Sequence, residues 1–389
     1  MNIEAVIGAN YGDEGKGLFT SYLCKNREKP IVVLSNGGCQ RGHTVDSLTR
    51  NRHVFHHFGS GTLEGAPSIF SHDYLLNPIL YVQEFHELLD YGMMVPRSFR
   101  APSCIIQLPG DFLINQSLEK HRQKTNSQHG SCGMGIWETI YRNCCHRPLK
   151  FSAFASMTYD DRKKYMAEEI EWQIENRLKP ENAKIDKELL KIVKSKGFID
   201  HFMKDTDFMA QHSFELPTDH LLEIDYEPIL KWRPLNAIIE NAQGLLLDKA
   251  YAPKDENGHV DVHSTPSMTG LEGAISALSL NSIKPVSVTA NYVTRTYFTR
   301  HGAGPFPEFT KGLAYRDLTN VQNDYQGAMR FGEMTEEHAQ KLIDRVNADS
   351  NYNNRNIVLT HLNEAKAPSV LSEAASYFSN APYAVKHIG

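Results

Sequence analysis

Short apolar runs alternate with glycine-rich turns and helical patterns along most of the chain. The first run, IEAVIG at 3–8, precedes GLFTSYLCKN at 17–26, in which Leu18, Phe19, Tyr22 and Leu23 share one helical face. Later apolar, β-rich runs end in polar or glycine residues: PIVVLS at 30–35, NAIIENAQG at 236–244, PVSVTANYVTR at 285–295 and NIVLTHL at 356–362. This alternation predicts an α/β fold with a mainly parallel central sheet and functional residues at the carboxyl ends of its strands.

The pattern changes between about 158 and 231. Here YDDRKKYMAEEIEWQIENRLK and KELLKIVKSKGFIDHFMK are charged, follow a helical period and contain no glycine-rich turn. We predict a helical insertion within a single domain that spans residues 1–389.

Composition narrows the class of protein. Apolar residues make up 41% and charged residues 22%, as is usual for soluble enzymes. The net charge of −5 argues against nucleic acid as the main partner. No apolar stretch reaches the length of a membrane span, and the chain opens on a strand rather than a signal sequence. The six cysteines form no CxxC pair, so we expect a reduced, cytoplasmic protein.

The first loop, GANYGDEGKG at 8–17, is P-loop-like but incomplete. A standard phosphate loop has glycine, four residues, then Gly-Lys-Ser/Thr, whereas Asn10 replaces the first glycine here and Gly17 replaces the hydroxyl residue. The strand, the glycines, Lys16 and the following helix still favour an anion. Asp13 and Glu14 add two carboxylates, which suit a site that holds magnesium or accepts a substrate proton. The alternative is a tight turn with a capping acid.

Four motifs occur in a recognisable order: GDEGKG at 12–17, GGCQRGHT at 37–44, NAQGLLLD at 241–248 and TRHGAGPFPE at 299–308. From about residue 3 to 364 the chain resembles the adenylosuccinate synthetase family. The resemblance implies a ligase that joins the amine of L-aspartate to C6 of a 6-oxopurine nucleotide. A purine nucleoside triphosphate first phosphorylates O6, and the amine then displaces phosphate. It also implies Mg²⁺ and a homodimer.

The resemblance assigns roles to individual residues. Asp13 matches the base that takes the N1 proton and contacts the metal, and Gly42 offers the metal a carbonyl. His43 matches a histidine that donates to the phosphoryl group as charge develops. Lys16 matches the phosphate-loop lysine. Further nucleotide contacts are expected at Gly12, Glu14, Gly15, Gly17, Gln40, Thr44, Ser131, Cys132, Arg147, Gln243 and Thr265.

Some of these positions depart from the family pattern. Ser131 and Cys132 replace two threonines of a Gly-Thr-Thr-Gly turn, and Gln40 replaces an asparagine. Arg147, with Arg142 behind it, is the candidate for an arginine that the family borrows from the partner subunit.

Two departures bear on the substrates. The family's arginine-rich aspartate loop is shortened to NDYQGAMRFGEM at 323–334, where Arg330 is the candidate for holding a carboxylate. The guanine-reading TKxD becomes THLN at 360–363. Because the amide of Asn363 both donates and accepts, we expect ATP to be used at least as well as GTP.

Alternatives remain open at this point. A viral relative of the family acts on dGMP with ATP and shares the altered loop and the asparagine, but it has serine where this chain has Asp13. No motif separates IMP from GMP or dGMP. A non-catalytic nucleotide-binding paralogue would not need Asp13 together with His43. A P-loop kinase would need the missing hydroxyl, and HVFHH at 53–57 offers a less favoured metal site.

Overall fold

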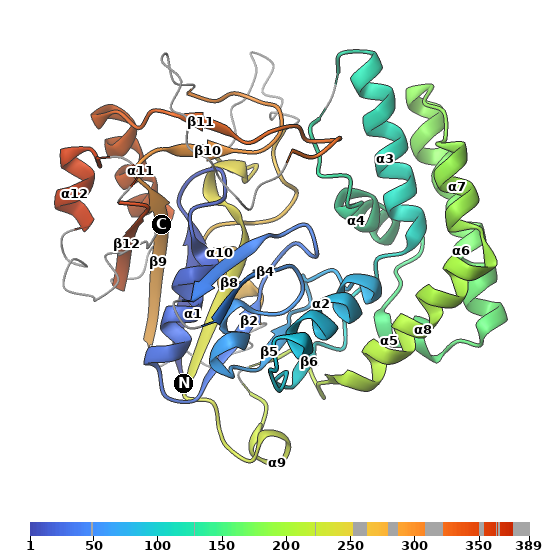
Figure 1. Cartoon of the computed structure of the whole chain (residues 1–389), viewed down its shortest axis with the longest axis horizontal. Helices are drawn as coiled ribbons and strands as arrows, with labels where there is room; N and C mark the ends of the chain where they lie inside the picture. The colour runs from blue at the N-terminus through green and yellow to red at the C-terminus, as the bar shows by residue number, and fades with distance from the viewer. Residues whose placement is uncertain are drawn as a thin grey trace.

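An eight-stranded sheet forms the centre of the molecule (Figure 1). The computed structural model describes residues 1–47, 50–127, 129–221, 223–251, 263–278, 287–307, 322–349, 354–362, 364 and 366–375. Every neighbouring pair of strands in this sheet is parallel, which confirms the predicted fold class. In spatial order the strands are β12 (Asn354–Thr360), β9 (Ser287–Arg295), β1 (Asn2–Gly8), β8 (Asn236–Gly244), β2 (Pro30–Leu34), β5 (Ser68–Phe70), β6 (Ser98–Arg100) and β7 (Ser213–Glu215).

The five strands from β12 to β2 correspond to the five apolar runs of the sequence. Their order brings the carboxyl ends of β9, β1, β8 and β2 next to one another, and each of these ends leads into a polar motif. Val6 and Leu34 both lie opposite Glu240, and β1 continues to Gly8, so the first two loops start close together at this edge of the sheet. Sites of open α/β proteins form at this edge.

Short strands were not visible in the sequence. β5, β6 and β7 have three residues each, which is too few for a periodic pattern. Two small antiparallel pairs lie outside the main sheet: β3 (His43–Ser47) with β4 (Arg50–Phe55), and β10 (Phe298–Arg300) with β11 (Arg330–Gly332).

Helix α1 (Lys16–Asn26) turns a different face inward than its apolar residues predict. Leu23 is buried, but Leu18, Phe19 and Tyr22 are only half-buried, and the small residues Thr20, Ser21 and Cys24 are buried instead. The reason is close packing against η1 (Ser60–Glu64), where a Cβ on Gly61 would lie 2.3 Å from Cys24 Sγ. Small side chains permit this approach.

A layer of helices stands on one side of the sheet (Figure 1). The segment predicted to be helical contains α6 (Tyr159–Gln173), α7 (Lys187–Val193), α8 (Lys196–His212) and α9 (Glu227–Leu230). However, α3 (Pro109–Lys124) packs on α6 and α7, and β7 within the segment pairs with β6 of the main sheet. The division into domains stays a prediction.

The remaining helical elements either join the helical layer or lie against the strands of the sheet. They are α2 (Pro78–Asp90), α4 (Ile136–Cys145), α5 (Phe151–Ser156), η2 (Ile174–Leu178), η3 (Lys179–Glu181), η4 (Leu245–Leu247), α10 (Leu271–Ser276), α11 (Glu336–Asp349) and α12 (Ser369–Ala375). None of the helices in the described ranges is both long and apolar enough to cross a membrane.

Candidate active site

The loop after β1 folds around the side chain of Glu14. Its Oε1 accepts hydrogen bonds from the backbone N–H groups of Asn10 (3.1 Å) and Gly12 (2.8 Å), and its Oε2 lies 2.7 Å from Lys16 Nζ. Burial alone would raise the pKa of Glu14, but the charge of Lys16 and the backbone donors outweigh it, and the pKa is lowered. A Cβ at Gly8 would lie 2.5 Å from Oε2, so only glycine fits there. Glu14 therefore acts as an internal anion that fastens the loop.

Asp13 points the other way. Its backbone is left-handed (φ 60°), a conformation that costs a non-glycine residue about 1–2 kcal/mol. Its carboxylate is 18% exposed and lies 3.5 Å from His301 Nε2. Arg295 Nε donates to the Asp13 carbonyl at 2.5 Å, so the last residue of β9 holds the backbone of the loop. The two acids thus have separate positions, one inside the loop and one facing out.

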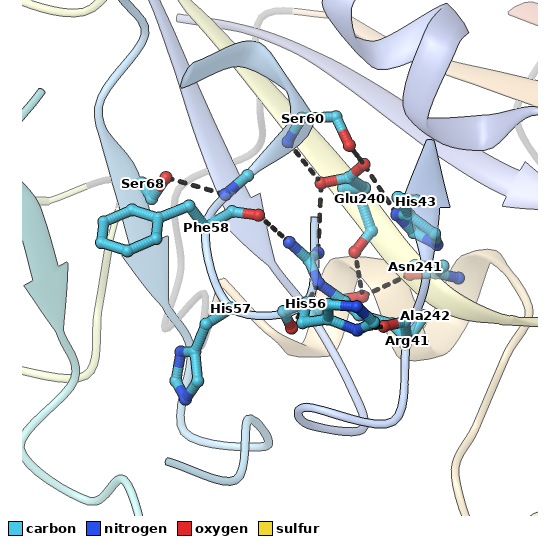
Figure 2. Close-up of polar contacts among 12 residues, drawn as sticks. Arg41, His43, His56, His57, Phe58, Ser60, Ser68, Glu240, Asn241 and Ala242 are labelled. Carbon is cyan, nitrogen blue, oxygen red and sulfur yellow. Dashed lines mark hydrogen bonds and ion pairs between the residues drawn. The ribbon is translucent and has the colours of Figure 1, made fainter. Parts of the chain in front are cut away.

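A second cluster surrounds Glu240, which lies within β8 (Figure 2). Its Oε2 is 3.1 Å from Arg41 Nη1 and accepts from the backbone N–H of Ser60 at 3.1 Å. Its Oε1 is 2.8 Å from His43 Nδ1 and also accepts from the Ser60 hydroxyl. Arg41 in addition donates to the carbonyls of His56 and Phe58. Glu240 was not among the residues predicted from sequence, although an acid inside an apolar strand run is a detectable signal.

Charge and burial define the state of this cluster. Burial alone would raise the pKa of Glu240, but Arg41, His43 and Ser60 bring it to about 2, so the group is a carboxylate. It can only accept, and His43 Nδ1 must therefore carry the proton between them. Burial lowers the pKa of His43, and Arg41 and Lys16 lower it further against the opposing charge of Glu240. His43 Nε2 is buried and has no hydrogen-bond partner among the described residues.

Other predicted contacts lie at the same edge. Gln40 packs against Gly37, where a Cβ would lie 2.4 Å from its Nε2, and its Oε1 is buried with no hydrogen-bond partner in the described ranges. Thr44 is half-buried in β3, and Gly42 is exposed beside it. Gln243 is half-buried near the end of β8. Thr265 donates its N–H to the Leu247 carbonyl at 2.6 Å, which anchors it beside β8.

The turn at 129–135 contacts the segment that leads to Arg330. Ser131 Oγ accepts from Asn115 Nδ2 at 3.0 Å, and the Cys132 carbonyl accepts from Asn323 Nδ2 at 3.4 Å. Burial raises the pKa of the Cys132 thiol, so this side chain is a neutral thiol at ordinary pH. Gly130 packs closely against the backbone of Ala303. Three segments distant in sequence thus meet here.

Arg330 is placed on the 299–308 motif. Its guanidinium donates to the carbonyls of Gly302 (2.7 Å) and Gly304 (3.1 Å) and lies 5.0 Å from the ring centre of Phe306. The predicted amino-acid-binding arginine is therefore in direct contact with this motif.

The two arginines considered for a partner subunit belong to the helical layer. Arg142 is fully buried and bonded to Asp111 through two contacts of 3.1 Å, so it is a core residue. Arg147 is 40% exposed and pairs with Glu168 and Glu169. The borrowed role of Arg147 stays a prediction.

Asn363 lies outside the described residues, so its role also stays a prediction. The end of β12 just before it does contact the phosphate loop, because Thr360 Oγ1 donates to the Glu14 carbonyl at 2.6 Å.

The histidines of HVFHH have structural contacts. His57 Nε2 accepts from the Asn77 N–H at 2.8 Å, and burial lowers the pKa of His57 to about 3. His53 Nε2 lies 3.7 Å from Glu84. Across the ranges that the structure describes, no three His, Cys, Asp or Glu side chains gather in a metal-binding group.

The oxygen donors at the loop nevertheless suit Mg²⁺. Asp13 offers a partly exposed carboxylate, whereas the Glu14 carboxylate is occupied by Lys16 and the backbone. Mg²⁺ typically takes one or two carboxylates and completes its shell with water and substrate phosphates. The residues present therefore fit a magnesium ion that binds together with nucleotide.

The parallel sheet and the glycine-rich loop with its lysine between β1 and α1 define an α/β protein with a P-loop-like turn at the carboxyl edge of its sheet. The family model of adenylosuccinate synthetase matches residues 5–328, and the chain belongs to that family.

Curated relatives are similar over most of this chain. An adenylosuccinate synthetase of Gloeothece citriformis is 29% identical over 309 residues, which are 79% of this chain and 62% of that protein. One of Blochmanniella pennsylvanica is 26% identical over 307 residues, or 78% of this chain and 63% of that protein. The chain thus spans less than two thirds of the length of these relatives.

Two solved structures share the fold. Fully ligated adenylosuccinate synthetase from Plasmodium falciparum superposes with a TM-score of 0.66 at 18% identity, covering 92% of this chain and 76% of that one. Succinoaminodeoxyadenylate synthetase of cyanophage S-2L, bound to dGMP and to dATP as an energy donor, has a TM-score of 0.59 at 14% identity. It covers 97% of this chain and 90% of that one.

Proposed function

We propose that the protein is a ligase that condenses L-aspartate with C6 of a 6-oxopurine nucleotide, either IMP or GMP/dGMP, driven by a purine nucleoside triphosphate. Family membership supports this class of reaction. The observation that carries it here is the presence of two groups: the partly exposed carboxylate of Asp13, and His43 Nε2, a buried nitrogen that lacks a partner among the described residues. A protein that only binds nucleotide has no need of both.

The proposed reaction has two steps. In the first, Asp13 takes the N1 proton, O6 bonds to the γ-phosphorus and the bond to the β-phosphate oxygen breaks, releasing a nucleoside diphosphate. In the second, the amine of aspartate bonds to C6 and loses a proton, the C6–O6 bond breaks, and phosphate leaves with O6 and takes up that proton. The loop lysine and His43 stabilise charge on the transferring group.

The structure sets a condition on His43. Because Glu240 accepts from Nδ1, the ring donates from Nε2 only as an imidazolium, whose charge the Glu240 carboxylate balances. Mg²⁺, held by Asp13 and the Gly42 carbonyl, would neutralise charge on the phosphates when bound.

The amino-acid side of the reaction rests on fewer contacts. We place a carboxylate of aspartate on Arg330, next to the carbonyls of Gly302 and Gly304 that position its guanidinium. We further propose a homodimer in which Arg147 is offered to the partner's site, by analogy with the family.

A second candidate is the use of dGMP with ATP or dATP. It is favoured by the likeness to the cyanophage enzyme, which is bound to dGMP and to dATP as an energy donor and whose fold matches 97% of this chain. Asn363 in place of the family's aspartate is a sequence feature that points the same way.

A substrate matrix tests the proposal. IMP, GMP and dGMP are each incubated with aspartate and either ATP or GTP, and the product masses are measured. We expect one nucleotide to gain the mass of aspartate less water, with ATP used at least as well as GTP. No product in any combination would refute the ligase, and a strong GTP preference would refute the role given to Asn363.

A further inference from the structure

We propose that Glu240 is a positioning residue for the reaction, which fixes the His43 ring so that Nε2 faces the transferring phosphoryl group. This inference rests on the proposed function, and it assigns a role to a residue that none of the motifs above includes. Glu240 does not touch substrate in this account and acts through His43.

The position of Glu240 suits this role. It lies in β8, between β1 and β2, where its backbone is paired with Val6 on one side and Leu34 on the other. His43, in contrast, starts the small β3–β4 hairpin outside the main sheet. A carboxylate held on the central sheet therefore fixes the orientation of the His43 ring.

The two oxygens of Glu240 divide their partners. Oε2 takes Arg41 Nη1 and the Ser60 N–H, while Oε1 takes His43 Nδ1 and the Ser60 hydroxyl (Figure 2). Neutralising Arg41 requires only the first oxygen. Oε1 accepts from His43 Nδ1, and the hydrogen bond from the Ser60 hydroxyl to the same oxygen fixes the orientation of the carboxylate.

This geometry determines which ring atom is presented. Because the carboxylate can only accept a hydrogen bond, the neutral His43 ring must carry its hydrogen on Nδ1. The opposite atom, Nε2, is then left buried without a partner among the described residues. Triads in which an acid orients a histidine lose most of their rate when an amide replaces the acid, because the wrong tautomer results.

A matched buried pair serves as the structural reference. Asp111 binds Arg142 in the helical layer, and both side chains are 0% exposed, as is the side chain of Glu240. Among the described residues, Asp111 hydrogen-bonds to Leu108, Thr139, Arg142 and Gln173 and to no histidine, so Asp111→Asn makes the same chemical change without touching His43.

The test is a double-mutant cycle on the full chain, read as kcat and KM. We expect Glu240→Gln to lower kcat roughly a hundredfold or more while the nucleotide KM changes less than about threefold. His43→Ala should show a similar loss, and the double variant should be no slower than His43→Ala alone. Glu240→Asp should recover part of the rate. Asp111→Asn should lower stability and leave kcat of the folded protein unchanged.

The proposal would be overturned if the kcat of the double variant fell by the product of the two single losses, or if Glu240→Gln had normal kcat.

A second readout needs neither activity nor a folded variant at position 240. In protein labelled with ¹⁵N-histidine, the His43 signal, assigned by its loss in His43→Ala, should show hydrogen on Nδ1. Hydrogen on Nε2 alone would refute the positioning role even if the ligase reaction is confirmed, whereas an inactive protein with hydrogen on Nδ1 would refute the proposed function and leave only the orientation of the ring by Glu240 in place.

Discussion

Replacing Asp13 with asparagine is expected to remove the chemical step while nucleotides still bind. An amide has no carboxylate to take the N1 proton, and loss of a general base typically costs a hundredfold or more. The loop should keep its shape, because Arg295 holds it through the Asp13 carbonyl and asparagine tolerates the left-handed backbone. The measurement is kcat, with nucleotide affinities determined separately by calorimetry.

Asp46→Asn is the control for this experiment. Asp46 is another partly exposed carboxylate, 3.7 Å from Arg52 on the β3–β4 hairpin, and its loss should leave kcat unchanged. Turnover of Asp13→Asn near that of the parent protein would show that Asp13 is not the base.

The second large effect is expected at Lys16. Lys16→Gln should lower affinity for the triphosphate roughly a hundredfold, since several kcal/mol of charge-assisted contact is lost. It should also lower the free energy of unfolding by about 3–5 kcal/mol, because Glu14 would remain buried without its partner. Calorimetry and denaturant unfolding measure the two losses.

A double variant separates these two roles of Lys16. Glu14→Gln combined with Lys16→Gln removes both buried charges and should recover most of the stability without recovering triphosphate binding. Recovery of both properties would show that Lys16 serves only to neutralise Glu14, and that another group binds the triphosphate.

Long strands and their terminal motifs were predictable from sequence. β1, β2, β8 and β9 are largely apolar because both faces of a central parallel strand are buried, whereas β12, at the edge of the sheet, is buried mainly in its second half. The loop at 8–17 was also predictable, since its glycines adopt backbone conformations that few other residues accept, as at Gly12 (φ 111°) and Gly15 (φ 94°).

Contacts between distant residues were not predictable in the same way. Glu240 and His43 are 197 positions apart, and nothing local to either residue specifies the other. The orientation of Glu14 was not predictable either, although its contacts are local. The motif marks Glu14 as a site residue, but only the folded loop shows that its carboxylate points inward and accepts from backbone N–H groups. In α1, the small residues face inward because η1, which comes from another part of the chain, lies against them.

The central claim is that O6 of the purine is phosphorylated and then leaves as phosphate. It is tested most directly by supplying the accepted 6-oxopurine nucleotide with oxygen-18 at O6, together with aspartate and the triphosphate, and measuring the mass of the released phosphate. The account predicts one oxygen-18 atom in each phosphate and one labelled phosphate for each aspartyl product. Unlabelled phosphate, or phosphate released without product, would contradict it.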